Sequence, residues 1–388
     1  MAKQRIFYVS PVSSEELNRR FEQRHYVGPA DAKVFGVCRA LRSAGANAVI
    51  VSTAINRRST DRWSQALRTR GIPFIRVAAT GRAALKRIFT AFTLLHFAMR
   101  TVKHRDRVLL YNFFPEYFLL AIYLKLTGVP AVLDVEDGPT ADEKGARGVM
   151  TRVSYALIRP LTATRSVVAS ISLASRLGLP HVLPIYGVAR PLSDRKVIRF
   201  AGSRLGVLFG GAIMPETGSE LFTSAVRLLA AEMPNKAIDF HVTGHFDRQR
   251  FLALKQEVEA LSSLRVLVHG ALTATEYDNL MSKVDVGLCL KLPSHEMGQT
   301  TFPSKVVEIT SLGLLLCTTQ VSDVPELFDD TTSALLRGES PEELSQILAK
   351  IDANREEWAK VAVRGQEKAQ AMFAPLAVAS RMEPFLRG

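Results

Sequence analysis

The feature that most constrains this chain is the alternation of short, β-branched apolar runs with helical stretches along its whole length. The first half opens with such runs at 5–10 and 47–52, and the second half has them at 204–209 and 237–242. Strands alternating with helices are typical of βαβ units and parallel sheets. The sequence therefore predicts an α/β fold of two Rossmann-like, doubly wound domains that face each other across a cleft.

The length of 388 residues fits two or three domains. We place the seam in the Pro- and Arg-rich stretch 183–199, so that residues 1–188 form the first domain and 189–372 the second. Residues 373–388 are expected to form a helix that crosses back to the first domain. A helix is expected over 32–43, with Asp31 as its N-cap, and another over 61–69. Ligands of such sheets bind beyond the carboxyl ends of the strands, so functional residues are expected in the loops there.

Charge is distributed unevenly between the halves. Residues 1–190 carry 29 Lys and Arg against 12 Asp and Glu, whereas residues 191–388 carry 21 against 25. A basic half indicates a polyanionic neighbour, either nucleic acid or an anionic membrane, unless it is merely a solvated basic face. We recognise no nucleic-acid-binding module, so nucleic acid is not an expected partner.

The basic stretch 82–107 predicts peripheral contact with an anionic membrane, because a basic helix with an aromatic face can lie in a bilayer interface. The alternative is a core helix whose charged ends reach solvent. The apolar residues expected on the membrane face are Ile88, Phe89, Phe92, Leu94, Leu95 and Phe97.

Cysteine and histidine usage indicates a reducing compartment and no metal site. Cys38, Cys289 and Cys317 lack metal-ligand spacing. His241 and His245 stand four apart at a strand end, without a carboxylate in register. No long apolar run or signal peptide is recognised, so we expect a cytoplasmic protein on the inner face of the cell membrane.

The segment 301–308 carries the clearest sign of a ligand. Pro303 precedes Ser304, which is expected to cap a helix, and a helix N-terminus suits a phosphate. Lys305 puts a cation in the first turn, where it is unfavourable unless an anion binds. Glu308, three residues on, could accept hydrogen bonds from a ribose diol, or could simply pair with Lys305 on the surface.

Two further strand ends in the second half are candidates. Gly210 and Gly211 follow an apolar strand and would let the backbone approach a phosphate or a sugar. His269 and Gly270 end another strand and could flank a nucleobase, although a plain turn is an equal reading.

In the first half, a run of carboxylates ends an apolar strand. Glu136 and Asp137 follow it, and Asp137 could serve as a general base or orient a hydroxyl. Capping of the next helix is the alternative. The long loop 11–29 carries Arg24, His25 and Gly28, and we expect it to contact an acceptor. For His25, a plain solvated loop histidine is the alternative.

These residues resemble a known family. The pattern Phe-Pro-Ser-Lys-x-x-Glu at 302–308, followed by Gly313 and by Pro325-Glu326, is similar to the donor site of family-4-type glycosyltransferases with the GT-B fold. The likeness is strong over 285–327 and looser elsewhere. Outside 285–327, the likeness rests on Gly28 and on residues 135–139, 185–188, 208–211, 241–244 and 269–270.

The resemblance implies a nucleotide-diphosphate sugar bound to the second domain and an acceptor bound to the first, with no metal or other cofactor. It implies that Glu308 holds the ribose, that Lys305 and Ser304 lie at the phosphates and that Gly211 approaches the diphosphate. It also implies that the stretch 295–300, with Glu296, Gly298 and Thr300, approaches the donor sugar.

The chain departs from the family at two places. A glutamate often stands eight positions before the one matching Glu308; here that position is Thr300, and Glu296 lies four residues earlier. The family's basic pair after the opening strand would fall near Ala212 and Thr217, which are not basic. Candidate replacements are Lys305, Lys291 and Arg190.

The function expected from these residues and this resemblance is glycosyl transfer to a lipid-linked or polysaccharide acceptor at the cytoplasmic membrane face. Three alternatives stay open. One is a GT-B protein that binds nucleotide or glycan without turnover, for which the missing basic pair is the sequence basis. Another is a different GT-B enzyme, either a sugar-nucleotide epimerase or a phosphorylase. The last is a nucleic-acid binder, which the basic first half would allow.

Overall fold

A computed structural model describes residues 4–13, 17, 28–54, 64–78, 83–138, 145–190 and 197–387. The chain divides into two compact units. The first comprises residues 1–188 and 373–388, and the second comprises residues 189–372. Among the described residues, no helix is long and apolar enough to cross a membrane.

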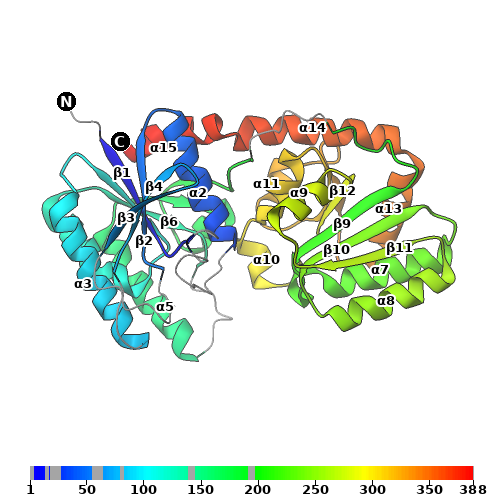
Figure 1. The fold of residues 1–388 in the computed structure, drawn as a ribbon, viewed down its shortest axis with the longest axis horizontal. Helices are drawn as coiled ribbons and strands as arrows, with labels where there is room; N and C mark the ends of the chain where they lie inside the picture. The colour runs from blue at the N-terminus through cyan, green and yellow to red at the C-terminus, as the bar shows by residue number, and fades with distance from the viewer. Residues whose placement is uncertain are drawn as a thin grey trace. The chain divides into compact units, whose positions relative to one another are not determined.

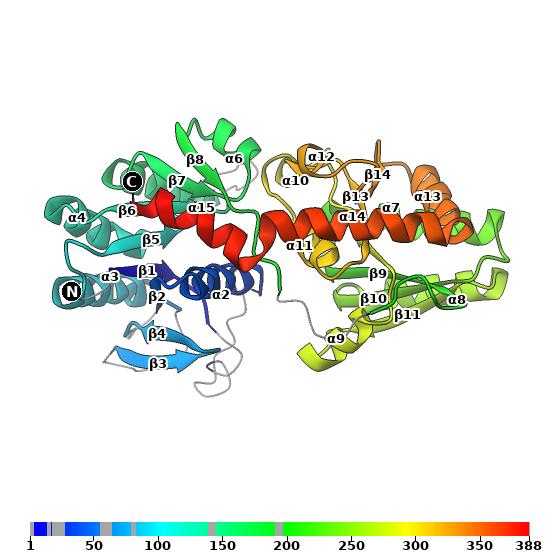
Figure 2. The ribbon, with the colours of Figure 1, turned by 90° about the horizontal axis from the view of Figure 1, so that it is seen from above.

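The first unit is built on an eight-stranded sheet in the order β3-β4-β2-β1-β5-β6-β7-β8, which Figure 2 shows. Every strand runs parallel to its neighbours except β3, which is antiparallel to β4. The strands are β1 (Arg5–Ser10), β2 (Asn47–Ser52), β3 (Gln65–Thr69), β4 (Ile72–Arg76), β5 (Arg107–Tyr111), β6 (Ala131–Val135), β7 (Arg165–Val168) and β8 (His181–Pro184).

Helices cover both faces of this sheet, because most of its strands are apolar on both sides. One core lies beneath α2 and α15, which lie side by side in Figure 1. The other core lies beneath α3, α4, α5 and α6. The helices are α2 (Gly28–Ser43), α3 (Ala83–Thr101), α4 (Phe118–Thr127), α5 (Gly145–Ile158), α6 (Ile171–Arg176) and α15 (Pro375–Arg387), with single 3₁₀ turns at Pro115–Tyr117 and Arg159–Leu161.

The second unit is a parallel six-stranded sheet in the order β11-β10-β9-β12-β13-β14, which is the doubly wound order of dinucleotide-binding folds. Figure 1 shows α7 and α8 side by side along β9, β10 and β11. The strands are β9 (Leu205–Ala212), β10 (Ile238–His245), β11 (Arg265–Gly270), β12 (Val286–Cys289), β13 (Leu315–Thr319) and β14 (Ala334–Leu336). The helices are α7 (Ser219–Glu232), α8 (Arg248–Leu261), α9 (Ala274–Met281), α10 (Glu296–Thr300), α11 (Ser304–Ser311), α12 (Val324–Leu327), α13 (Pro341–Ala353) and α14 (Arg355–Phe373), with a 3₁₀ turn at Pro215–Thr217.

Three local predictions were wrong. Residues 65–69 are the strand β3 and not part of a helix, because Arg70 and Gly71 both take positive φ angles and turn the chain back onto β4. The helix expected from residue 32 begins at Gly28, so Asp31 lies inside its first turn, where its carboxylate accepts the Ser13 backbone N–H at 3.2 Å.

The helix expected to be capped by Ser304 begins with Ser304 itself. Pro303 is the flanking residue, and no side chain caps this helix end.

The C-terminal helix α15 completes the first unit. Val378, Met382 and Leu386 are buried on α2 and the sheet edge. The Leu386 carbonyl accepts hydrogen bonds from Arg107 at 3.1 Å and from Arg165 at 3.3 Å.

We therefore predict that Met382→Ala lowers the free energy of unfolding of the first unit by about 2–5 kcal/mol, because it opens a cavity in a packed core. Leu376→Ala, at a position on the same helix that is 64 % exposed, is the matched control and should change it by about 0.5 kcal/mol or less. Urea denaturation checks both variants. Equal effects would show that α15 does not belong to this core.

Candidate functional site

The topology of the second unit points to the carboxyl ends of β9 and β12. The strand order reverses between these two neighbours, and ligands of doubly wound sheets bind at such a switch point. Gly211 closes β9 with a φ angle of 115°. A Cβ atom added to Gly211 would lie 3.5 Å from Cε of Lys305, so this glycine leaves the backbone open beside the lysine.

Lys305 lies in the first turn of α11 and joins two partners. Its Nζ donates to Glu308 Oε2 at 2.7 Å and to the Tyr277 hydroxyl on α9 at 2.9 Å. The ammonium also lies 5.1 Å from the centre of the Tyr277 ring. Burial disfavours the charge, but Glu308 and Tyr277 outweigh it and raise the pKa of Lys305. Lys305 is therefore a fixed cation at the start of a helix.

Glu308 also forms an ion pair with a second cation, Arg190. Arg190 Nη2 lies 3.6 Å from Glu308 Oε1, and its Nη1 donates to Asp278 at 3.0 Å. Burial would raise the pKa of Glu308, but Lys305 and Arg190 hold it below its ordinary value. Two cations thus converge on one ionised carboxylate beside the N-terminus of α11, which is an arrangement suited to an anion that also offers hydroxyl groups.

Lys291 follows β12 at the same edge of the sheet. Its Nζ donates to the Thr301 carbonyl at 3.4 Å. Burial raises the pKa of the Cys289 thiol to about 11, although Thr318, Lys291 and Lys305 oppose it, so both lysines are close enough to act on this thiol. All three candidate replacements for the missing basic pair therefore lie around the ends of β9 and β12. Ala212 and Thr217 stand where the missing basic pair would lie. There the Thr217 hydroxyl donates a hydrogen bond to the Ala212 backbone carbonyl at 2.9 Å.

The stretch 295–300, expected as a loop, contains the short helix α10. Thr300 is buried and its hydroxyl donates to the Glu296 carbonyl at 3.1 Å. A Cβ atom on Gly298 would come within 2.0 Å of the Leu292 carbonyl, so only glycine fits there without a backbone shift. Residues 296–300 form a single helical turn, which packs against the segment that follows β12.

His269, expected beside a nucleobase, stacks on His241. Their rings are nearly parallel at 4° with centroids 5.3 Å apart, and His241 Nδ1 lies 3.0 Å from His269 Nε2. Burial, and then His269, lower the pKa of His241 to about 4. The pair is therefore neutral near pH 7 and presents His269 as an exposed flat ring at the carboxyl end of β11.

In the first unit, the switch point lies between β1 and β5, and β6 is the next strand. Lys33, on α2, is buried and donates to Asp134 Oδ1 at 2.9 Å and to Glu136 Oε1. The Tyr8 hydroxyl donates to the other Asp134 oxygen. Burial lowers the pKa of Lys33, and Asp134 and Asp137 oppose that shift. A buried cation thus gathers three carboxylates at one strand end.

Asn112 shapes the turn that carries the predicted catalytic carboxylates. It takes a positive φ of 54°, and its Oδ1 accepts the backbone N–H groups of Glu136 at 2.8 Å and Asp137 at 3.3 Å. Asp137 is exposed, whereas Glu136 is half-buried on Lys33. Burial, and then Asp137 and Asp134, raise the pKa of Tyr111 at the end of β5. Of the two carboxylates, Asp137 is therefore the more exposed.

Sequence reasoning missed several of these groups. Lys33, Tyr8 and Asn112 were not singled out, because a single lysine or asparagine carries no spacing signal and only the fold brings them to Asp134. Tyr277 was missed for the same reason. Gly28 lies at the first position of α2, whereas Arg24 and His25 lie outside the described residues.

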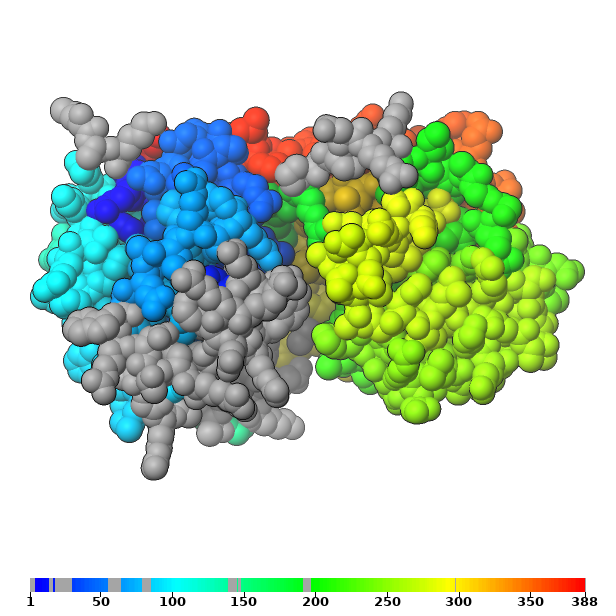
Figure 3. All heavy atoms as spheres, viewed as in Figure 1, coloured from blue at the N-terminus to red at the C-terminus, as the bar shows by residue number. Residues whose placement is uncertain are grey.

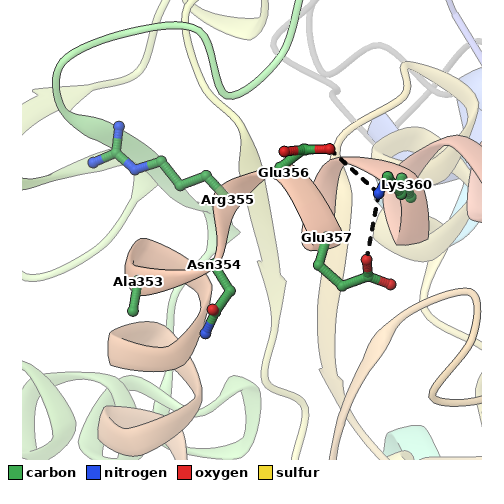
Figure 4. Close-up of a pocket in the computed structure, with 6 residues that line it drawn as sticks. All are labelled: Ala353, Asn354, Arg355, Glu356, Glu357 and Lys360. Carbon is green, nitrogen blue, oxygen red and sulfur yellow. Dashed lines mark ion pairs between the residues drawn. The ribbon is translucent and has the colours of Figure 1, made fainter.

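Two other features carry no ligand argument. No group of three or more His, Cys, Asp or Glu side chains suited to a metal occurs within the described ranges. Figure 4 shows a hollow where α13 meets α14, lined by Ala353, Asn354, Arg355, Glu356, Glu357 and Lys360. Its charged groups pair locally: Lys360 with Glu356 and Glu357, and Arg355 with Asp352. The hollow therefore arises from the junction between α13 and α14.

The chain is similar to known proteins in part of its sequence and in its fold. The glycosyl transferase-like family matches residues 222–384. HepE of Anabaena, solved with UDP and glucose, superposes with a TM-score of 0.67 at 15 % identity, covering 99 % of each chain. Sucrose-phosphate synthase from Thermosynechococcus elongatus gives 0.66 at 15 %, covering 99 % of this chain and 98 % of that one.

WaaG, a glycosyltransferase involved in lipopolysaccharide biosynthesis, gives a TM-score of 0.62 at 15 % identity, covering 99 % of this chain and 100 % of its own. No curated protein matches the sequence. At such identities the structures establish the fold, and the predicted GT-B fold is confirmed. The match of residues 222–384 to the glycosyl transferase-like family agrees with the resemblance stated from the sequence.

The buried cluster around Lys33 yields a prediction. Lys33→Met should lower the free energy of unfolding of the first unit by about 3–5 kcal/mol, because Asp134 and Glu136 would lose their cation in a buried site. Lys125→Met, on the exposed end of α4, is the control and should have little effect. Chemical denaturation measures both. A Lys33 variant as stable as the control would show that the cluster is not held by this lysine.

Proposed function

We propose that this glycosyltransferase moves a sugar from a nucleotide-diphosphate sugar to a lipid-linked or polysaccharide acceptor at the cytoplasmic face of a membrane. The observation that carries the proposal is the meeting of Lys305, Arg190 and Glu308 beside Gly211 at the switch point of the second unit. Cations and a helix N-terminus suit a diphosphate, and a carboxylate suits a ribose diol.

On the donor side, Glu308 would accept hydrogen bonds from the ribose hydroxyls. The diphosphate would lie against the N-terminus of α11, where it meets Ser304 and Lys305 and the open backbone at Gly210 and Gly211. Arg190 and Lys291 would supply the charge that Ala212 and Thr217 do not. The sugar would lie near α10, with its residues Glu296, Gly298 and Thr300, and the base near His269.

HepE supports a donor of this class, since it has been solved with UDP-glucose and shares the fold. We therefore choose UDP as the first nucleotide to test. No metal is proposed. The cations of the protein would stabilise the charge that develops on the departing diphosphate, because they are already oriented in a partly buried site.

On the acceptor side, Asp137 is proposed as the general base, with Glu136 beside it. A hydroxyl oxygen of the acceptor would attack the anomeric carbon of the sugar and form the new C–O bond. The bond from that carbon to the diphosphate oxygen would break, and the nucleoside diphosphate would leave with the electron pair. The hydroxyl proton would pass to the carboxylate of Asp137. Arg24, His25 and Gly28 are proposed to contact the acceptor.

The membrane part of the proposal rests on charge. The excess of Lys and Arg in the first half suits an anionic surface or a pyrophosphate-linked lipid acceptor. WaaG, which shares the fold, takes part in lipopolysaccharide biosynthesis, and this supports a glycolipid or polysaccharide acceptor here.

The donor assignment predicts that Glu308→Gln weakens UDP binding about tenfold or more, which corresponds to about 1.4 kcal/mol, because a neutral amide accepts the ribose hydrogen bonds less well. Glu257→Gln, in an exposed pair with Arg227 on the same unit, is the matched control and should bind UDP as the wild type does. Isothermal titration calorimetry gives both affinities. An unchanged affinity for Glu308→Gln would remove the ribose assignment.

The acceptor assignment predicts that Asp137→Asn lowers the transfer rate about 10²- to 10⁴-fold while UDP affinity stays unchanged, because a general base acts only in the chemical step. Mass spectrometry of products, with a panel of nucleotide sugars and membrane extract as the source of acceptor, measures transfer. Glu136→Gln, tested alongside, should cost less. A fully active Asp137→Asn would contradict the assignment.

The same assay separates the alternatives. Nucleotide binding with no product from any acceptor would favour a protein without turnover. A nucleotide sugar converted in the absence of acceptor would favour an epimerase.

A further inference from the structure

The helix α3 of the first unit has two different faces. Leu94 and Phe97, both expected at a membrane, are instead buried in the core beneath the sheet. The opposite face is also apolar, since Leu85, Ile88 and Phe92 are 60 %, 56 % and 59 % exposed. A surface helix normally exposes polar residues to solvent. An exposed apolar face of this kind is typical of a surface that binds a partner.

The helix α5 presents a second stripe of the same kind. Val149, Met150, Val153 and Leu157 lie at helical spacing and are between 40 % and 53 % exposed. Nine of the fourteen large apolar residues exposed within the described ranges lie on α3, α4 and α5. Among the described residues, the exposed large apolar side chains are therefore concentrated on one helical layer. We define the α3–α5 face by Leu85, Ile88, Phe92, Met99, Val149, Met150, Val153 and Leu157.

The two stripes adjoin each other. Arg87 on α3 reaches Met150 on α5, with its Nη1 3.9 Å from the sulfur. Both helices pack on the same core of the sheet, so both outer stripes point away from the same face of it. Figure 1 shows α3 and α5 as neighbours, and the cyan atoms of the α3 region reach the surface in Figure 3. The two stripes of the α3–α5 face therefore meet at Arg87 and Met150.

The charge around this patch has one sign. The sequences of α3, α4 and α5 contain no Asp or Glu. Arg100, Lys125 and Arg152 are exposed on them, and Arg87 is half-exposed. Glu116, beside α3, is buried and lies 3.9 Å from Arg87. An apolar patch on helices that carry cations and no carboxylate of their own complements a bilayer that contains anionic lipid.

We propose that the α3–α5 face is a membrane-docking surface, whose apolar side chains enter the interface of an anionic bilayer. The cationic side chains would lie at the headgroup level, where they attract anionic lipid. A second copy of the chain fits this face less well, because a two-fold contact would bring the same cations together and the helices α3, α4 and α5 themselves supply no acidic residue to pair them.

The position of the face deepens the proposed function, on which this step of the inference rests. In a βαβ unit, a helix starts at the edge where the preceding strand ends. The N-terminus of α5 is therefore at the edge where β6 presents Glu136 and Asp137. Docking through the N-terminal halves of α3 and α5 would bring this edge close to the lipid surface, where a lipid-linked acceptor is held.

Vesicle flotation of the full-length protein tests the surface directly. We expect the wild type to float with vesicles of phosphatidylcholine and phosphatidylglycerol and much less with phosphatidylcholine alone. Phe92→Glu combined with Val153→Glu should reduce the floating fraction about tenfold or more, because two carboxylates would enter the interface. Leu261→Glu combined with Val363→Glu, at positions 67 % and 54 % exposed on the second unit, is the matched control and should float like the wild type.

A second pair of variants separates charge from apolar insertion. Arg100→Gln combined with Arg152→Gln should lessen the preference for phosphatidylglycerol and leave the weak binding to neutral vesicles unchanged. Light scattering of the free protein checks self-association, and UDP affinity checks folding and the donor site of the docking variants.

Wild type that stays unbound with anionic vesicles would overturn the proposal, and so would Phe92→Glu/Val153→Glu that floats normally. A dimer lost in that variant, without flotation of the wild type, would assign the face to self-association. Flotation with no UDP binding would keep this surface and contradict the proposed function instead, so the two failures are distinguishable.

Discussion

The ion pair between Lys305 and Glu308, 2.7 Å long and beside Gly211, is the interaction on which the account of this enzyme depends. It exists because a doubly wound sheet reverses its strand order between β9 and β12 and thereby exposes a helix N-terminus next to a strand end. The pair keeps both groups ionised in a partly buried place. In the proposed donor complex, a diphosphate and a ribose would replace the partner of each group without a change in either charge.

The first unit uses the same topology for a different arrangement of charge. Its switch point holds a buried lysine, Lys33, beneath Asp134, Glu136 and Asp137. The lysine neutralises the two deeper carboxylates and leaves Asp137 exposed. The second unit therefore presents cations at its strand ends and the first unit a carboxylate, and the proposed function assigns these groups to the leaving diphosphate and the attacking hydroxyl.

Much of this could be predicted from the sequence, because periodicity and glycine-rich strand ends are local signals. The alternation of strands and helices indicated parallel sheets, and the 302–308 pattern indicated the donor family. Lys33, Tyr277 and Asn112 could not be found, since their partners are distant in sequence and only the fold brings them together. The strand β3 was missed because its pairing depends on the turn at Arg70 and Gly71. The outer stripe on α5 was missed because a helix of apolar and basic residues does not reveal which side is buried.

The most direct test of the central claim is hydrogen–deuterium exchange of the full-length protein with and without UDP. Binding of UDP at the Lys305–Glu308 pair should slow exchange at the end of β9, around Gly210 and Gly211, and in the first turns of α11 from Ser304 to Glu308. Slower exchange confined to other elements, with both of these segments unchanged at saturating UDP, would contradict it.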